Sequence, residues 1–369
     1  MIQVQRPSIG NEELEGVKKV FETGWLGMGK SVFDFEDRIK ELLGVKNIVA
    51  VNTGTTAIHL VLDSLDLKRG DEVIVPSFTF AATIQAIIAC GATPVFCDIE
   101  SDTLNMDATD MKKRITARTK AIMPVHYGGL SCDMDEILKT AKERSLRVVE
   151  DAAHAFGSSY KGRMIGSFGD IACFSFDPIK NITCGEGGAI ATDDDEISGV
   201  MKKKRVLGID KDTWSRFGQK KDWFYSVNMT GFRYHMSNIN AAIGLVQLEK
   251  LDRFLSRKKE IVQRYDDSFM GVDGIEILKR DYEGTAFFSY VIKVEEKRDE
   301  LMEFLKERGI GSGVHYIPNH FQPLFKDYRV VLPVTEKVWQ EIITLPLYYD
   351  MTDDDVGLVI RSVLEFFNR

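Results

Sequence analysis

The sequence predicts an α/β protein built on a mostly parallel sheet, followed by a smaller α+β region at the C-terminal end. Three observations predict this architecture. Between residues 45 and 191, short apolar, β-branched runs alternate with amphipathic stretches, as in βαβ units. From about residue 237 the pattern changes to one long helix. Beyond it, a strand pattern is followed by two separate helical patterns.

The first region predicts seven strands, each a short apolar run. They are residues 47–51, 72–75, 94–97, 121–125, 147–150, 171–176 and 189–191. Helices are expected between them at residues 55–64, 83–89 and 133–145. The acidic run at 193–196 is typical of a turn and a helix start, where the helix dipole favours acids. Because helical crossovers join the strands into one sheet, we expect no domain boundary inside this region.

The C-terminal region predicts a connecting helix and a small domain. Apolar residues recur with a 3.6-residue period over residues 237–268. A strand is expected at residues 285–294, and helices at 297–308 and 353–367. We therefore expect a large domain over residues 1–236, and the connecting helix with the small domain over 237–369.

Composition and charge exclude several classes of protein. The chain has 369 residues, of which 44% are hydrophobic and 28% charged, as in ordinary globular proteins. A net charge of −8 gives no electrostatic reason to bind nucleic acid or an anionic membrane. No apolar run approaches the ~20 residues that span a bilayer, and the N-terminus lacks the features of a signal peptide. Five cysteines without a Cys-x-x-Cys pair indicate reduced thiols and no metal site. We expect a cytoplasmic protein.

The segment VNTGTTA, residues 51–57, joins a predicted strand to the start of a helix. Free backbone N–H groups and the helix dipole at Gly54 and Thr55 would form a cradle for an anion such as phosphate. The alternative is an ordinary helix cap, since Thr is common at that position.

The segment VVEDAAH, residues 148–154, carries Asp151 to the C-terminal tip of an apolar strand. A buried carboxylate needs a partner, and a protonated ring nitrogen of a cofactor would be one. The alternative is a helix cap or a structural salt bridge. His154 either faces the same site or is a core histidine.

The segment CFSFDPIKNITCGEGG, residues 173–188, places Lys180 in a turn before a Gly-rich loop. Most lysines are surface groups, but apolar surroundings would lower the pKa of this amine and favour a nucleophile. Ser175 would add a hydroxyl to the same pocket. An anion cradle, a strand-end acid and a lysine are together the groups that pyridoxal 5′-phosphate (PLP) requires.

On these segments, the sequence resembles the sugar-nucleotide aminotransferases of the DegT/StrS family, a branch of fold-type I PLP enzymes. The resemblance covers nearly the whole chain. It rests on residues 71–80 (DEVIVPSFTF), 150–157 (EDAAHAFG), 174–176 (FSF), 180–183 (KNIT) and 185–188 (GEGG). Within the family, the sequence is most similar to the UDP-4-amino-4-deoxy-L-arabinose synthase type, through His154, residues 179–184 and residues 213–216 (TWSR).

The resemblance implies a role for each matching residue. Lys180 matches the lysine that forms a Schiff base with PLP and then moves the proton during transfer. Asp151 matches the acid that pairs with the ring nitrogen. His154 matches the group that contacts the ring hydroxyl, and Phe80 the aromatic side chain stacked on the ring. The phosphate anchors are matched by Gly54, Thr55 and Ser175.

The resemblance also implies a homodimer with shared sites, because a further phosphate anchor usually comes from the neighbouring subunit. The family carries Gly-Tyr-Asn-Tyr-Arg at that point, whereas this chain has GFRYH at residues 231–235. Arg233 thus stands where Asn or Lys is expected. Its forked guanidinium suits phosphate, with an intersubunit salt bridge as the alternative. Asn228 is a second candidate for this anchor.

Substrate contacts are implied for five residues: Trp25, His126, His315, Tyr316 and His320. The alternative for the last three is a place in a turn or at the domain interface.

The implied activity is PLP-dependent transfer of an amino group from an amino acid, expected to be L-glutamate, to a keto carbon of a nucleotide-linked deoxysugar. C4 is the preferred position and C3 the alternative. The pathway expected is that of a cell-surface glycan such as lipopolysaccharide. A related dehydratase branch typically carries His in place of the lysine, so Lys180 argues against it. A non-catalytic regulator would need neither Lys180 nor Asp151.

Overall fold

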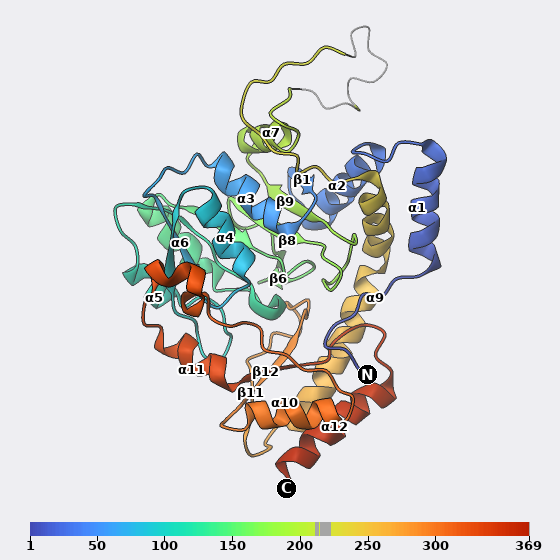
Figure 1. The fold of residues 1–369 in the computed structure, drawn as a ribbon, viewed down its shortest axis with the longest axis vertical. Helices are drawn as coiled ribbons and strands as arrows, with labels where there is room; N and C mark the ends of the chain where they lie inside the picture. Colours follow the sequence, from blue (N-terminus) through green and yellow to red (C-terminus); the bar gives the residue numbers. More distant parts are fainter. Residues whose placement is uncertain (211–213, 215–222, 369) are drawn as a thin grey trace.

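A seven-stranded sheet lies at the centre of the larger part of the molecule (Figure 1). This computed structural model describes residues 1–210, 214 and 223–368. The strand order is β1-β9-β8-β5-β4-β2-β3; β9 pairs antiparallel with both β1 and β8, and the other pairings are parallel. The strands are β1 (Asn47–Val51), β2 (Glu72–Pro76), β3 (Thr93–Cys97), β4 (Thr119–Ile122), β5 (Arg147–Asp151), β8 (Ile171–Ser175) and β9 (Gly188–Thr192). The mostly parallel sheet is therefore confirmed.

Helices cover both faces of this sheet because alternate residues of each strand point to opposite sides. In β1, Val49 and Val51 pack in a core with α3 (Gly54–Ser64), α4 (Ala81–Ala89) and α7 (Asp195–Lys204). Ile48 and Ala50 pack in another core with α2 (Lys30–Leu43) and the first half of α9 (Asn238–Phe269). A third core involves α5 (Ala108–Lys113) and α6 (Met134–Arg144). Burial on both faces explains why these strands are uninterrupted apolar runs.

The C-terminal part contains a three-stranded antiparallel sheet (Figure 1). Its strands are β10 (Ile275–Ile277), β11 (Tyr290–Val294) and β12 (Ile342–Leu345). The sheet shares a core with the second half of α9, with α10 (Arg298–Glu307) and with α12 (Asp353–Phe367). The long helix α9 thus contributes to the cores of both parts, and α1 (Asn11–Thr23) packs along it. The division of the chain after residue 236 stays a prediction.

Several expectations about single elements were wrong in detail. β4 ends at Ile122 rather than at residue 125, because Pro124 has no N–H to donate to the sheet. The strand expected from residue 285 begins only at Tyr290. The preceding residues instead pack on a turn, where the Phe288 N–H donates to the Gly128 carbonyl (3.0 Å). Helices α1 and α2 were not predicted. Only Trp214 of the 213–216 motif lies inside the described residues.

Other expectations are confirmed. Asp194 caps α7, so the acidic run does form a turn and a helix start. All five cysteines are free thiols. In the part of the chain that the structure describes, no helix has both the length and the apolar character needed to cross a membrane.

Candidate active site

The C-terminal ends of β1, β5 and β8 border a cavity of about 490 Å³. Ligands of open parallel sheets bind at this edge of the sheet. β5 ends at Asp151, β8 ends at Ser175, and Thr53 leads from β1 into α3. The cavity is lined by most of the residues that the sequence singles out: Gly54, Thr55, Phe80, Asp151, His154, Ser175, Lys180, His315 and Tyr316.

Glycines let the start of α3 approach the end of β8. A Cβ atom on Gly54 would lie 2.6 Å from the Ser175 Cβ, and one on Gly188 would lie 2.4 Å from the Thr53 carbonyl oxygen. Thr53 caps the helix by accepting a hydrogen bond from the Thr56 N–H (3.1 Å). The first N–H groups of α3 have no partner within the helix, and the Ser175 hydroxyl lies beside them. This arrangement fits a phosphate group.

The carboxylate of Asp151 is buried at the tip of β5, with 4% of the residue exposed. It accepts hydrogen bonds from the Thr83 hydroxyl (2.7 Å) and the Ala153 N–H (3.1 Å). Burial raises the pKa of Asp151, and these two hydrogen bonds act in the opposite direction. A cationic N–H in the cavity would stabilise the ionised carboxylate further. The ring nitrogen of PLP is such a group.

The amine of Lys180 enters the same cavity from the turn after β8. The turn is closed by a hydrogen bond from the Lys180 N–H to the Asp177 carbonyl (3.1 Å). The Nζ atom lies 4.4 Å from the centre of the Phe288 ring. Burial lowers the pKa of Lys180 to about 8, although Asp177 and Asp151 oppose the shift. The amine therefore has a substantial neutral, nucleophilic fraction near neutral pH.

His154 is held by two aromatic side chains. Its ring stacks on Phe288 (ring centres 4.1 Å apart, planes at 14°), and its Nε2 lies 3.0 Å from the Tyr316 hydroxyl. Burial, together with the charge of Lys180, holds the pKa of His154 well below its usual value, so the ring is neutral. Its Nδ1 is buried and has no hydrogen-bond partner among the described residues. The ring hydroxyl of PLP could supply that partner.

Two residues near the site were missed by the sequence reasoning. Gln5 lines the cavity, and its side-chain amide donates to the Phe288 carbonyl (3.0 Å). Phe288 forms the surface on which His154 stacks. These two residues are 283 positions apart, and neither lies in a motif. Only the folded chain brings them together.

Two residues predicted to contact the substrate are buried away from the cavity. His126 is completely buried: its Nε2 lies 3.0 Å from Glu150, and its Nδ1 accepts from the Cys132 N–H (3.1 Å). His320 is 2% exposed, and its Nδ1 lies 2.7 Å from the Ser77 hydroxyl. Neither residue lines the cavity. Their rings are enclosed by the protein's own groups, and the predicted substrate contacts stay predictions.

Three other predicted residues lie outside the cavity of their own chain. Trp25 packs edge to face on Trp214 (5.1 Å) and donates to the Met28 carbonyl (2.9 Å). Asn228 and Arg233 are exposed on the segment that leads to α9. The roles given to them involve a substrate or a second subunit, so they stay predictions.

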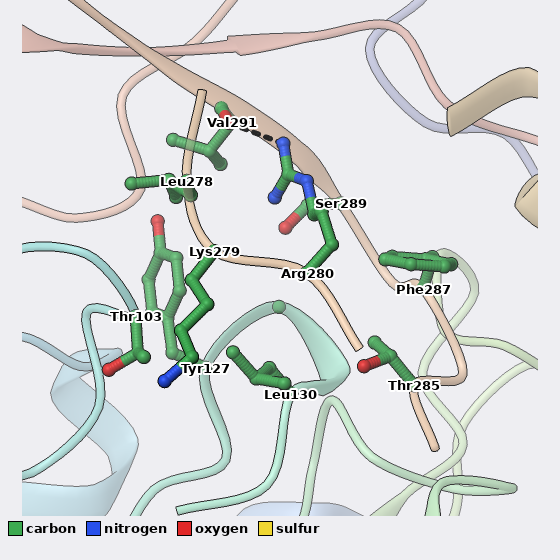
Figure 2. A pocket seen from close by; sticks show the side chains of 11 residues that line it. Thr103, Tyr127, Leu130, Leu278, Lys279, Arg280, Thr285, Phe287, Ser289 and Val291 are labelled. Carbon is green, nitrogen blue, oxygen red and sulfur yellow. Dashed lines mark hydrogen bonds between the residues drawn. The ribbon is translucent and has the colours of Figure 1, made fainter. Parts of the chain in front are cut away.

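A second cavity, shown in Figure 2, lies where the turn around Tyr127 meets residues 278–291. Its volume is about 20 Å³, which is enough for one water molecule. The guanidinium group of Arg280 at its wall donates to the Val291 carbonyl (3.0 Å). This cavity cannot hold a cofactor, whereas the larger one has both the volume and the matching groups.

Comparisons with known proteins agree with this interpretation. The model of the DegT/DnrJ/EryC1/StrS aminotransferase family matches residues 7–364. The spore coat polysaccharide biosynthesis protein SpsC of Bacillus subtilis is 42% identical in an alignment of length 368 that covers 97% of this chain and 95% of SpsC.

Solved structures are also similar to this chain. The PMP form of the putative sugar aminotransferase Spr1654 from Streptococcus pneumoniae has a TM-score of 0.94 at 32% identity, covering 100% of this chain and 99% of that one. Spr1654 is also known in a PLP form. Helicobacter pylori PseC, an aminotransferase involved in the biosynthesis of pseudoaminic acid, has a TM-score of 0.93 at 30% identity, with 100% and 99% covered.

The residues present fit PLP. The start of α3 with Ser175 suits the phosphate, Asp151 the ring nitrogen, His154 the ring hydroxyl and Lys180 the aldehyde. When bound, PLP supplies an electron sink for amino-group transfer. The match over nearly the whole chain and the geometry of the cavity lead to one conclusion: this chain belongs to the DegT/DnrJ/EryC1/StrS aminotransferase family and is a PLP-dependent sugar aminotransferase.

Proposed function

We propose that this enzyme transfers an amino group from L-glutamate to the C4 keto carbon of a nucleotide-linked deoxysugar, as the UDP-4-amino-4-deoxy-L-arabinose synthase type does. The observation that carries the proposal is that the Lys180 amine, the Asp151 carboxylate and the N-terminus of α3 line one cavity. The product would enter a cytoplasmic pathway for a cell-surface glycan such as lipopolysaccharide. SpsC, named for spore coat polysaccharide biosynthesis, and PseC support such a pathway.

Each residue of the cavity has a separate task in this proposal. Lys180 binds the cofactor through its amine and later carries a proton to and from the substrate carbon. Asp151 holds a proton on the ring nitrogen, since the buried carboxylate is stabilised by that charge. The first turn of α3 and Ser175 fix the phosphate. His315 and Tyr316, which line the cavity, would contact the sugar.

We also propose that the active unit is a homodimer in which Arg233 or Asn228 reaches the phosphate of the partner subunit. The segment before these residues exposes large apolar side chains: Trp223 (70%), Phe224 (58%) and Val227 (60%). Exposed apolar groups so close together are typical of a surface covered by another protein. A second copy of this chain is the partner that the proposed shared site requires.

The first test is an absorbance spectrum of the purified protein and of K180A, before and after addition of L-glutamate. We expect a PLP band in the wild type that bleaches with glutamate, and loss of this behaviour in K180A. Other amino acids serve as controls for the donor. Two results together would contradict the role of Lys180: glutamate leaves the wild-type band unchanged, and K180A shows the same band as the wild type.

The second step determines the acceptor. The glutamate-treated enzyme is mixed with 4-keto and 3-keto deoxysugars linked to UDP, dTDP or GDP, and the aminated carbon is located by NMR. Amination at C4 is the expected result. Amination at C3 only would overturn the C4 proposal while leaving the aminotransferase assignment intact.

A further inference from the structure

A second buried lysine lies behind the turn that carries Lys180. Lys258, on α9, is 5% exposed, and its Nζ donates to the Asn181 side-chain oxygen (2.8 Å). A cavity of about 20 Å³ beside it is bordered by the titratable residues Arg6, Lys180, Tyr348 and Tyr349. Among the described residues, no carboxylate lines this cavity. Burial alone lowers the pKa of Lys258, to about 7.

The amide of Asn181 connects Lys258 to the active site. Asn181 follows Lys180 directly in the chain and is 4% exposed. While its oxygen accepts from Lys258, its nitrogen donates to the carbonyls of Phe156 (3.2 Å) and Ala286 (3.0 Å). Ala286 is two residues before Phe288, over whose ring the Lys180 amine lies. The amide thus joins the lysine turn to the segment that carries Phe288.

Comparison with Lys250 shows that Lys258 is unusual. Lys250 lies eight residues earlier on the same helix and is equally buried (7% exposed). Its amine is paired with two carboxylates, those of Glu12 and Glu13, each at 2.6 Å. Lys258 has no ion pair among the described residues and only a neutral amide as partner. Burying an amine without a counter-charge is unfavourable, so a purely structural role would be served better by an apolar side chain.

We propose that Lys258 is a positioning residue for Lys180: its amine orients the Asn181 amide, and the amide fixes the turn from which Lys180 reaches the cofactor. The amine donates this hydrogen bond whether it is charged or neutral. The inference rests on the proposed role of Lys180 as the lysine that binds PLP.

The test compares K258M with K250M in the PLP-loaded enzyme. K258M keeps an unbranched side chain, one atom shorter, and removes the donor. We expect it to lower kcat about 10- to 100-fold with little change in the KM for glutamate, because misplacing a reacting group impairs chemistry more than binding. The pH midpoint at which the PLP band changes should also shift, with Tm close to that of the wild type.

K250M is the matched control. It should leave kcat and the spectral midpoint unchanged but lower Tm, because Glu13 then stays buried without its cation. A third variant, N181A, tests whether Lys258 acts on Lys180 through the Asn181 amide. N181A should lower kcat as K258M does. The double variant N181A/K258M should have a kcat no lower than that of N181A alone. N181A also provides the measurement if K258M does not fold.

Three results would overturn the inference: wild-type kcat and spectral midpoint in K258M, the same profile in K250M as in K258M, or fully additive defects in the double variant. A different result, a wild-type PLP band that K180A does not alter, would refute the role of Lys180 itself. The two failures are therefore distinguishable.

Discussion

At the scale of single residues, the lowered pKa of Lys180 predicts how cofactor uptake depends on pH. The neutral amine attacks the aldehyde, and burial lowers its pKa to about 8. The rate of PLP uptake by the apoprotein should rise about tenfold per pH unit below this value and level off above it. Stopped-flow absorbance between pH 5.5 and 9.5 measures this rate. A rate that keeps rising towards pH 10 would mean that the amine is not desolvated.

Several of the predicted residues that line the cavity lie next to a strand end or a helix start. Asp151, Ser175 and Gly54 take their positions from β5, β8 and α3, so a local pattern was enough to place them. His126 also follows a strand, but its ring turns into the protein towards Glu150. Gln5 came from the far end of the chain. Side-chain direction and long-range contacts are tertiary properties that a local pattern does not contain.

At the scale of elements, the close packing of α3 against β8 predicts that G54A weakens cofactor binding. The added Cβ would lie 2.6 Å from that of Ser175, so the start of α3 must move away from the strand. We expect a loss of stability of about 1–3 kcal/mol from overpacking and a tenfold or larger increase in the Kd for PLP, about 1.4 kcal/mol. Chemical denaturation and PLP titration measure the two effects.

Gly199 within α7 provides the control, because a Cβ there would have nothing within 4 Å. G199A should keep the wild-type Kd for PLP and gain up to about 1 kcal/mol from the better helix propensity of Ala. Unchanged PLP binding in G54A would show that the helix start does not hold the phosphate.

The elements themselves were predictable to different degrees. Strands buried on both faces are continuous apolar runs, so all seven were found, with errors of a few residues at their ends. The prediction failed where a segment serves the site instead of the sheet, as in residues 285–289. Those residues are apolar enough for a strand, but their backbone bonds to the turn at Gly128 keep them out of the ladder.

At the scale of the whole molecule, the change of pattern near residue 237 predicted the long helix and a smaller α+β part beyond it, although only one strand of its three-stranded sheet was predicted. What the sequence pattern could not determine is how the parts meet. The cavity is built from the large sheet but is closed by His315 and Tyr316 from the C-terminal part. Tyr316 contacts His154, 162 residues away, through one hydrogen bond. The position of His315 and Tyr316 relative to the large sheet depends on how the cores of the two parts pack on the shared helix α9.

The proposed shared site makes a prediction that only the dimer can test. If Arg233 anchors the phosphate in the partner's site, each active site takes Lys180 from one subunit and Arg233 from the other. K180A and R233A therefore remove groups that different subunits contribute to the same site. A mixed dimer then contains one site with both defects and one with neither. When the two inactive variants are unfolded together and refolded in equal amounts, random pairing should restore about a quarter of the wild-type activity. Each variant refolded alone should stay inactive or nearly so, and both should elute as dimers. Absence of recovery in mixed dimers would place Arg233 in its own subunit's site or in a purely structural contact.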